Sequence, residues 1–303
     1  MNASLLTASY GQALQVAQAA AGHQHYPHGA LYMVATPIGN LADISLRALH
    51  VLQLVDAIAC EDTRHTSGLL RIYGITKPLL TAHQHNEHEA AQLIITRLRV
   101  GERVAYVSDA GTPAVSDPGA RLAADVRAAG LRVLPLPGAS SVTALLSVAG
   151  IADEDGAYVF QGFLSSKAKE RSTQVAAIAN EGRAVVLLEA PHRIEALAAA
   201  LAALGERPVT LGRELTKQFE DIATVPAHAI SAWLAADPHR IQGEFAIAIH
   251  PRAAEAKQTT EGQRVLLLLL PELPVKTAVK LAADITGEPR NALYDLALQL
   301  KKE

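Results

Sequence analysis

The sequence of 303 residues has few of the features that define several large classes of protein. Cys60 is its only cysteine, which excludes a disulfide scaffold and suits a reducing compartment. The longest aliphatic run, at 265–270, is far shorter than the roughly 20 residues of a membrane-spanning helix. The first Lys or Arg is Arg47, so the sequence predicts no basic signal or transit peptide. We therefore expect a cytoplasmic protein without membrane contact.

Excess positive charge and aromatic rings are also scarce. Lys and Arg number 27 against 30 Asp and Glu, a formal net charge of −3, and only 4% of the residues are aromatic. Proteins that bind nucleic acid over their whole surface usually carry excess basic residues, and single-strand binders use aromatic stacking platforms. The composition therefore excludes indiscriminate nucleic-acid binding, and any phosphate contacts must be local.

Hydrophobic residues, in contrast, make up 50% of the chain, enough for buried cores in two domains. Strand-like apolar runs alternate with amphipathic helices, which is typical of an α/β fold with a helix-covered parallel sheet. We predict a disordered tail at 1–29 and an N-terminal parallel-sheet α/β domain at 30–150. A second α/β domain with a mixed sheet follows at 151–252, and a linker with a small helix-turn-helix-like module occupies 253–303.

Polar loops that follow predicted strands are where parallel sheets bind ligands. The segments TPIGN at 36–40 and SDAGTP at 108–113 are two such loops. Their backbone N–H groups and the carboxylate of Asp109 are suited to hold a small ligand. In the alternative interpretation, Asp109 caps a turn and 36–40 is an ordinary tight turn. The segment SDPG at 116–119 is expected to start a helix rather than contact a ligand.

Two charged segments allow more than one interpretation. EDTRHT at 61–66 either starts a helix with Asp62 as its N-cap, or presents Arg64 to a phosphate. The segment HQHNEHE at 83–89 holds three histidines, but no cysteine or HExxH helix accompanies them. We therefore predict no metal site, and instead a substrate-facing loop with Asn86 as a helix N-cap.

Taken together, the loops form an ordered set of motifs. They are VATPIGNL at 34–41, EDTRHT at 61–66, HNE at 85–87, SDAGTP at 108–113, PLPG at 135–138, GFL at 162–164, PHR at 191–193, RELTK at 213–217 and GE at 243–244. This set resembles the ribosomal RNA small subunit methyltransferase I family, a bacterial branch of the tetrapyrrole-methylase superfamily. The resemblance implies an S-adenosylmethionine-dependent enzyme that methylates the ribose 2′-oxygen of a decoding-region cytidine of 16S rRNA, conventionally numbered 1402. It also implies a homodimer that acts on the assembled small ribosomal subunit.

The resemblance also implies where the cofactor lies. The expected contacts are Pro37, Gly39, Asp109, Ala110, Gly111, Thr112, Val115, Ser140, Ser141, Leu188 and Glu189. The sequence departs from the family pattern at Ala139, Ser140 and Ser165, where many members carry proline or, at the first two, cysteine.

Catalysis and RNA binding need further residues. A 2′-hydroxyl is a poor nucleophile, so a base would help, and His85, Glu87 and Glu61 are the hypothesised bases. The expected phosphate contacts are Arg64, Lys167, Lys169, Arg171 and Lys217, with Lys276, Lys280 and Arg290 in the C-terminal module. Taken singly, each of the basic clusters could equally be a solvated face.

Two other functions remain open on the sequence. A C-methyltransferase of uroporphyrinogen or a precorrin would share the fold and cofactor, although the charged 61–66 cluster suits a phosphodiester better than a carboxylate-rich macrocycle. A non-catalytic nucleic-acid-binding regulator would use the C-terminal helices and would bind no S-adenosylmethionine.

Overall fold

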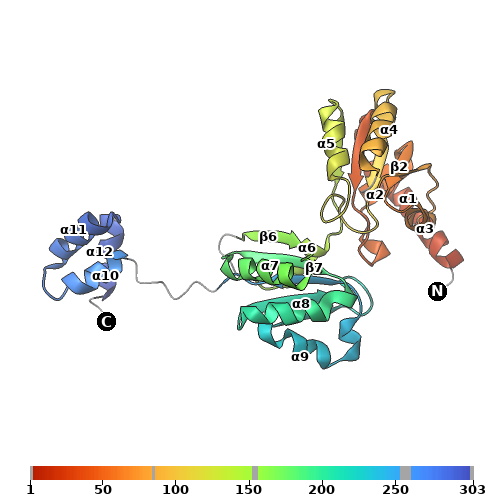
Figure 1. The fold of residues 1–303 in the computed structure, drawn as a ribbon. Coiled ribbons are helices and arrows are strands. Elements are labelled where there is room, and N and C mark those ends of the chain that lie inside the picture. The colour runs from red at the N-terminus through yellow and green to blue at the C-terminus, as the bar shows by residue number, and fades with distance from the viewer. Residues whose placement is uncertain (1–2, 84–85, 152–155, 253–260, 301–303) are drawn as a thin grey trace. The chain divides into compact units, whose positions relative to one another are not determined.

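The computed structural model describes residues 3–83, 86–151, 156–252 and 261–300. The chain forms two compact units, Met1–Pro251 and Arg252–Glu303 (Figure 1). The first unit contains two five-stranded sheets flanked by helices, and the second is helical in the residues described. The α/β fold class predicted from the sequence is confirmed. No helix in the described part of the chain is long and apolar enough to cross a membrane.

The first sheet is parallel throughout, in the order β3-β2-β4-β1-β5. Its strands are β1 (Ala30–Val34), β2 (Ala57–Cys60), β3 (Leu79–Thr81), β4 (Val104–Val107) and β5 (Arg132–Leu136). Every residue of β2 and β4 is buried, as expected for strands covered on both faces. Because all five strands are parallel, the loops after them meet at one edge of the sheet.

Helices cover both faces of this sheet. They are α1 (Ala3–Ala21), α2 (Leu46–Leu54), α3 (Thr63–Ile72), α4 (Glu87–Arg99) and α5 (Ala120–Ala128), with the short 3-10 helix η1 (Leu41–Asp43). Side chains of α1, α2 and α3 share one core with Tyr32 and Val34 of β1. Those of α4 and α5 share the other core with Leu31. The alternation along β1 thus follows the period of two residues in a strand.

The N-terminal segment differs from the tail expected at 1–29. Helix α1 packs against α2, and Ala17 and Ala21 are almost fully buried. Small alanine side chains allow the two helices to pack together, and the partner helix α2 lies outside the Ala-, Gln- and His-rich segment that was expected to be a tail. After the helix, the hydroxyl of Tyr32 donates a hydrogen bond to the carbonyl of Pro27 at 2.8 Å, so the connection to β1 is held as well.

The second sheet is mixed, as predicted, in the order β6-β7-β10-β8-β9. Its strands are β6 (Tyr158–Gly162), β7 (Ala184–Glu189), β8 (Pro208–Arg213), β9 (Asp221–Pro226) and β10 (Phe245–Ile249). Only β6 and β7 pair in parallel; the other neighbours are antiparallel. Three helices pack against one face of this sheet and form a core with it: α7 (Ala168–Asn180), α8 (Ile194–Leu201) and α9 (Ile230–Ala235). The connections contain the short 3-10 helices η2 (Pro191–Arg193), η3 (Ala202–Leu204), η4 (Ala227–Ala229) and η5 (Pro238–Ile241).

Helix α6 (Ser141–Val148) joins the two sheets. It follows β5 of the first sheet, but its residues Leu145 and the adjoining Ala149 pack against Ala246 and Ala248 of β10 in the second sheet. The face of the second sheet that α7, α8 and α9 leave uncovered is therefore occupied by a helix from the first half of the unit. This packing sets the loops of the first sheet beside the second sheet.

The second unit is a small bundle of α10 (Glu261–Leu269), α11 (Val275–Thr286) and α12 (Arg290–Leu300). Buried Leu266, Ala282 and Leu293, one from each helix, belong to its core. The sequence predicted the last two helices as a pair. Helix α10 is a third member of the bundle and covers apolar side chains of the other two. Gly287, at a φ of 75°, ends α11 in the left-handed conformation that favours glycine.

Candidate functional site

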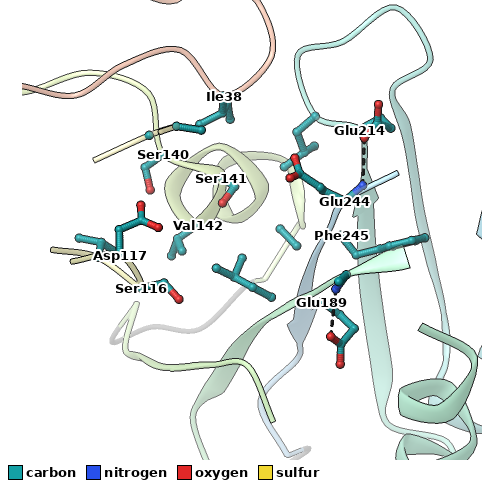
Figure 2. Close-up of a pocket in the computed structure, with 18 of the residues that line it drawn as sticks. Ile38, Ser116, Asp117, Ser140, Ser141, Val142, Glu189, Glu214, Glu244 and Phe245 are labelled. Carbon is teal, nitrogen blue, oxygen red and sulfur yellow. Dashed lines mark hydrogen bonds between the residues drawn. The ribbon is translucent and has the colours of Figure 1, made fainter. Parts of the chain in front are cut away.

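A cavity of about 270 Å³ opens in the first unit where the loop after β4 and the start of α6 face the second sheet. Figure 2 shows residues of its two walls. The first wall consists of Ile38, residues 110–112, residues 115–117 and residues 140–142. The second wall consists of Phe163, residues 188–191, Gly212, Glu214, Leu215, Lys217 and residues 244–246. Apolar side chains share both walls with carboxylates and hydroxyls.

Most of the cofactor residues that the resemblance implied line this cavity. They are Ala110, Gly111, Thr112, Val115, Ser140, Ser141, Leu188 and Glu189. The other three do not line it: Pro37 is buried in its loop, Gly39 is exposed, and Asp109 is half-buried one residue before the wall. Loops that are distant in the sequence therefore meet at this cavity. Their contacts with a cofactor remain a prediction.

Hydrogen bonds fix these loops to one another. Thr36 and Gly111 exchange two backbone hydrogen bonds, of 2.9 and 3.0 Å, which join the loop after β1 to the loop after β4. The hydroxyl of Thr112 donates to the carbonyl of Ala139 at 3.0 Å, which adds the loop after β5. Gly111 adopts a φ of 78°, with Ile38 close to the position of a Cβ atom, so a larger residue would disturb this junction.

The end of the loop after β4 is wound unusually. Ala114 and Ser116 have φ angles of 67° and 70°, which non-glycine residues rarely adopt, and strain of this kind concentrates at functional sites. The expectation that 116–119 starts a helix is confirmed at its end, since Gly119 is the N-cap of α5, but Ser116 and Asp117 also line the cavity. The length of the loop was the available signal: the connection from Ser108 to Gly119 is longer than an ordinary turn.

Glu87 holds this loop from behind. Its Oε1 accepts hydrogen bonds from the backbone N–H groups of Gly119, at 3.0 Å, and Leu122, at 3.4 Å. The side chain is buried and caps the N-terminus of α5, whose dipole favours a negative charge there. Glu87 does not line the cavity and its carboxylate is engaged by the start of α5, so the structure gives it a supporting position, and its role as a base stays a prediction.

The other two hypothesised bases are His85 and Glu61. His85 lies outside the described residues. Glu61 follows β2 and is half-buried, but it does not line the cavity. Burial raises its pKa, and the neighbouring negative charge of Asp109 raises it further. The alternative interpretation of EDTRHT as a helix start is confirmed, since Asp62 accepts from the N–H of Arg64 at 2.7 Å and caps α3.

Asp117 belongs to the same acidic group as Glu61 and Asp109. Burial raises the pKa of Asp117 to about 6, the charges of Glu61 and Asp109 add to the rise, and a hydrogen bond from Ser108 opposes it. Asp117 forms no ion pair with any residue that the structure describes. The first wall therefore presents a carboxylate that titrates close to neutral pH.

The second wall holds its carboxylates in ion pairs. Glu189, at the end of β7, is 2% exposed; its Oε1 lies 3.0 Å from Nε of Arg193 and accepts from the N–H of Ala190 at 2.9 Å. Nζ of Lys217 donates to Glu214 Oε1 at 2.8 Å and to Glu244 Oε2 at 3.1 Å. Each of these three carboxylates therefore faces a cation.

Lys217 differs from the phosphate contact that was predicted. It lines the cavity between Glu214 and Glu244, so its charge is already neutralised. A Cβ atom on Gly39 would lie only 2.4 Å from Cγ of Lys217, so glycine is required where this loop approaches the lysine stem. Glu214 has a φ of 50°, and Gly243, at 83°, leaves no room for a Cβ beside the Glu214 side chain.

The remaining basic residues fall into two groups. Arg64 and Lys169 are exposed and form no ion pair within the described ranges. Lys167 pairs with Glu170 at 2.9 Å, and Nη1 of Arg171 donates to the carbonyls of Ser165 and Ser166, so these side chains also order the loop after β6.

In the second unit, Lys276 and Lys280 are exposed on α11, and Arg290 pairs with Asp284 at 2.7 Å. Across the residues with described placement, no group of three or more His, Cys, Asp or Glu side chains is arranged to hold a metal ion.

Comparison with known proteins gives the class of the fold. Residues 30–230 match the family Tetrapyrrole (Corrin/Porphyrin) Methylases, and residues 256–301 match the RsmI C-terminal HTH domain. The chain also superposes on the crystal structure of uroporphyrin-III C-methyl transferase from Thermus thermophilus complexed with S-adenyl homocysteine. The TM-score is 0.51 at 16% identity, over 72% of this chain and 96% of that one. The fold is that of the tetrapyrrole methylases.

Curated relatives narrow the class. Ribosomal RNA small subunit methyltransferase I of Neisseria meningitidis serogroup A is 48% identical over 278 residues, 91% of this chain and 95% of the relative. The protein of the same name from Pseudomonas aeruginosa is 46% identical over 276 residues, 89% of this chain and 97% of the relative. The chain therefore belongs to the tetrapyrrole methylases and, within them, to the ribosomal RNA small subunit methyltransferase I family.

Proposed function

We propose that the chain transfers a methyl group from S-adenosylmethionine to the ribose 2′-oxygen of a decoding-region cytidine in 16S rRNA. The observation that carries this proposal is the identity of 46–48% with relatives named ribosomal RNA small subunit methyltransferase I, over about nine-tenths of the chain. The match to the RsmI C-terminal HTH domain extends the likeness to the second unit. We further propose a cytoplasmic homodimer that acts on the assembled small ribosomal subunit.

The charge of the cavity suits S-adenosylmethionine. The cavity's volume of about 270 Å³ is slightly below the roughly 300 Å³ at the lower end of the range for small-ligand pockets. The acidic side chains in its walls outnumber the single lysine, which suits a cationic ligand. Oδ1 of Asp109, next to the wall, is buried without a hydrogen-bond partner among the residues described, and a ligand donor would satisfy it.

The chain's own residues would bind and orient this cofactor. The backbone of residues 110–112 and the hydroxyls of Ser140 and Ser141 offer hydrogen bonds, and Leu188 and Phe245 offer apolar contact. When bound, S-adenosylmethionine supplies an electrophilic methyl group on a positively charged sulfur atom. The protein must then hold the ribose oxygen in line with that group and exclude water, since positioning alone can contribute a large part of the rate enhancement.

RNA contacts are expected outside the cavity. The carboxylates inside it would repel phosphates, whereas the exposed Arg64 and Lys169 are free of ion pairs within the described residues. With a net charge of −3, the chain offers few such contacts. A structured particle that also supplies shape complementarity is therefore a better substrate than naked RNA.

A tetrapyrrole C-methyltransferase is the second candidate, and the fold shared with uroporphyrin-III C-methyl transferase favours it. At 16% identity that likeness extends to the fold alone. A carboxylate-rich macrocycle also requires basic partners, whereas the cavity walls carry Asp117, Glu189, Glu214 and Glu244. The charge of the cavity therefore supports the RNA substrate.

The decisive experiment compares rRNA from cells with and without the gene by nucleotide-resolution mapping of 2′-O-methylation. We expect one decoding-region cytidine to lose its methyl group and to regain it when purified protein and S-adenosylmethionine are added to the 30S subunits. Labelling of uroporphyrinogen but not of 30S subunits in parallel assays would overturn the proposal. Calorimetry that shows no S-adenosylmethionine binding would instead favour a non-catalytic regulator.

A further inference from the structure

We propose that Asp117 is the general base that accepts the proton of the ribose 2′-hydroxyl. The inference rests on the proposed function and deepens it, because the sequence pointed to other residues for this role. It is carried by three features: the place of Asp117 in the cavity, its lack of a cationic partner, and the groups that surround it.

The position of Asp117 comes first. Its side chain is half-buried and lines the first wall, and Figure 2 shows its carboxylate directed toward the side chain of Ser140 at the start of α6. The backbone around it is held by the hydrogen bond from the Ala114 N–H to the Pro118 carbonyl and by the bond from the Gly119 N–H to Glu87. Asp117 thus projects from a fixed loop among residues that the cofactor is expected to contact.

The lack of a cationic partner distinguishes Asp117 from the other carboxylates in the walls. Glu189 is paired with Arg193, and both Glu214 and Glu244 are paired with Lys217. An ion pair stabilises the charged carboxylate and makes it a weaker base. Within the described residues, Asp117 is the carboxylate of the cavity wall that no cation neutralises.

The surrounding groups strengthen the base. Glu61 approaches from the loop after β2 and Asp109 from the loop after β4, and both carry negative charge. Tyr106 of β4 also lies near Asp117. His83 lies near Glu61 and lowers the pKa of Glu61, so it affects Asp117 only through Glu61. Burial and the charges of Glu61 and Asp109, against a hydrogen bond from Ser108, raise the pKa of Asp117 to about 6, so the side chain stays mostly ionised at pH 7 and yet binds a proton more readily than an ordinary aspartate.

The proposed step balances in atoms and charge. The 2′-oxygen forms a bond to the methyl carbon, and the carbon–sulfur bond breaks with its electron pair going to sulfur, which becomes neutral. The hydroxyl proton passes to the carboxylate of Asp117. One positive and one negative charge are thereby removed, and no oxidant, reductant or metal is required.

The test uses the full chain, 30S subunits from cells that lack the gene, and single-turnover methyl transfer at saturating S-adenosylmethionine. Asp117→Asn is expected to lower the rate constant about 100-fold or more, the range for loss of a general base. Its affinity for S-adenosylmethionine, measured by calorimetry, should stay within about threefold of that of the wild type. Asp117→Glu should recover part of the rate. Asp125→Asn on α5, an aspartate that lies outside the cavity and contacts His88, is the matched control and should keep the full rate.

The pH profile gives an independent readout. The wild-type rate constant should fall as the pH drops through about 6, and Asp117→Asn should lose this dependence. A flat wild-type profile between about pH 5 and 8 would overturn the inference without any variant. So would an Asp117→Asn rate within threefold of that of the wild type, or a loss of rate matched by an equal loss of S-adenosylmethionine binding. A wild-type chain that binds S-adenosylmethionine but leaves 30S subunits unmethylated would overturn the proposed function, and this inference with it.

Discussion

The two walls of the cavity differ in whether their carboxylates form ion pairs. On the second wall, Glu189, Glu214 and Glu244 are each held by a cation. On the first wall, Asp117 lies near Glu61 and carries no ion pair with any described residue. The difference does not follow exposure to water, because the paired carboxylates range from the buried Glu189 to the exposed Glu244, and the half-buried Asp117 lies between them. It comes from which residues the folding of each half places beside the acids.

The difference separates the roles of the two walls. Ion pairs fix the geometry of the second wall and suit it to hold a ligand in place. Unneutralised charge costs stability on the first wall, and proteins tolerate such costs mainly where function requires them. Under the proposed function, both walls would contact the cofactor, and only the first would also accept a proton.

The largest expected effect is a loss of stability when an ion pair of the second wall is removed. Glu189→Ala removes a carboxylate that is 1% exposed and leaves the side chain of Arg193, which is 26% exposed, without its ion pair. We expect the free energy of unfolding to fall by about 2–3 kcal/mol, somewhat less than for a fully buried pair. Chemical denaturation checks this, with Glu195→Ala on the exposed face of α8 as the control. An unchanged midpoint would show that the second wall does not depend on its ion pairs.

A second prediction separates support from chemistry on the first wall. Glu87→Ala removes the acceptor of two backbone N–H groups at the start of α5, at a cost of about 2 kcal/mol, whereas Glu87→Gln keeps an acceptor and should cost less. The exposed neighbour Glu89→Ala should have almost no effect in the same denaturation experiment. If Glu87→Gln abolished methyl transfer with full stability, Glu87 would need a chemical role after all.

A third prediction concerns the cost of the unpaired acid. Because folding raises the pKa of Asp117 to about 6, the folded state loses stability as the pH rises from about 4 to 6, where this group ionises. Asp117→Asn removes that cost. We expect it to be more stable than the wild type by about 1–2 kcal/mol at pH 7, discounted for partial exposure, and equally stable below about pH 4. Urea denaturation at the two pH values measures this. A variant that is less stable at pH 7 would remove the contrast between the walls.

The sequence anticipated most of this architecture because its signals are local. Apolar periodicity predicted the parallel first sheet, and turn residues placed the loops at 36–40 and 108–113. Asp62, which caps α3, was also one of two explicit alternatives. Motif resemblance added eight of the residues that line the cavity, although periodicity alone could not have shown which loops meet.

Local signals could not show the contacts between distant segments. Glu87 and Gly119 are 32 positions apart, and nothing near Glu87 in the sequence shows that it caps α5 rather than faces a substrate. Lys217 looked like a phosphate ligand because Glu244, one of its partners, lies 27 residues away. The carboxylate that stays unpaired could be identified only after every competing pair was known.

The smallest expected effect extends the comparison to the surface. Arg64 lies in the first turn of α3, three positions after Glu61, and has no ion pair within the described residues, whereas Lys167, from the half with the second sheet, pairs with Glu170. Because an unpaired cation releases more counterion on meeting a phosphate, Arg64→Ala should weaken binding to 30S subunits a few-fold and reduce the slope of log affinity against log salt by about 1. Lys167→Ala, the matched control, should change both less. Filter binding between about 50 and 200 mM salt measures the slopes. Equal slopes for the two variants would mean that the pairing of surface cations does not decide which of them contact RNA, and that the contrast between the halves is confined to the cavity.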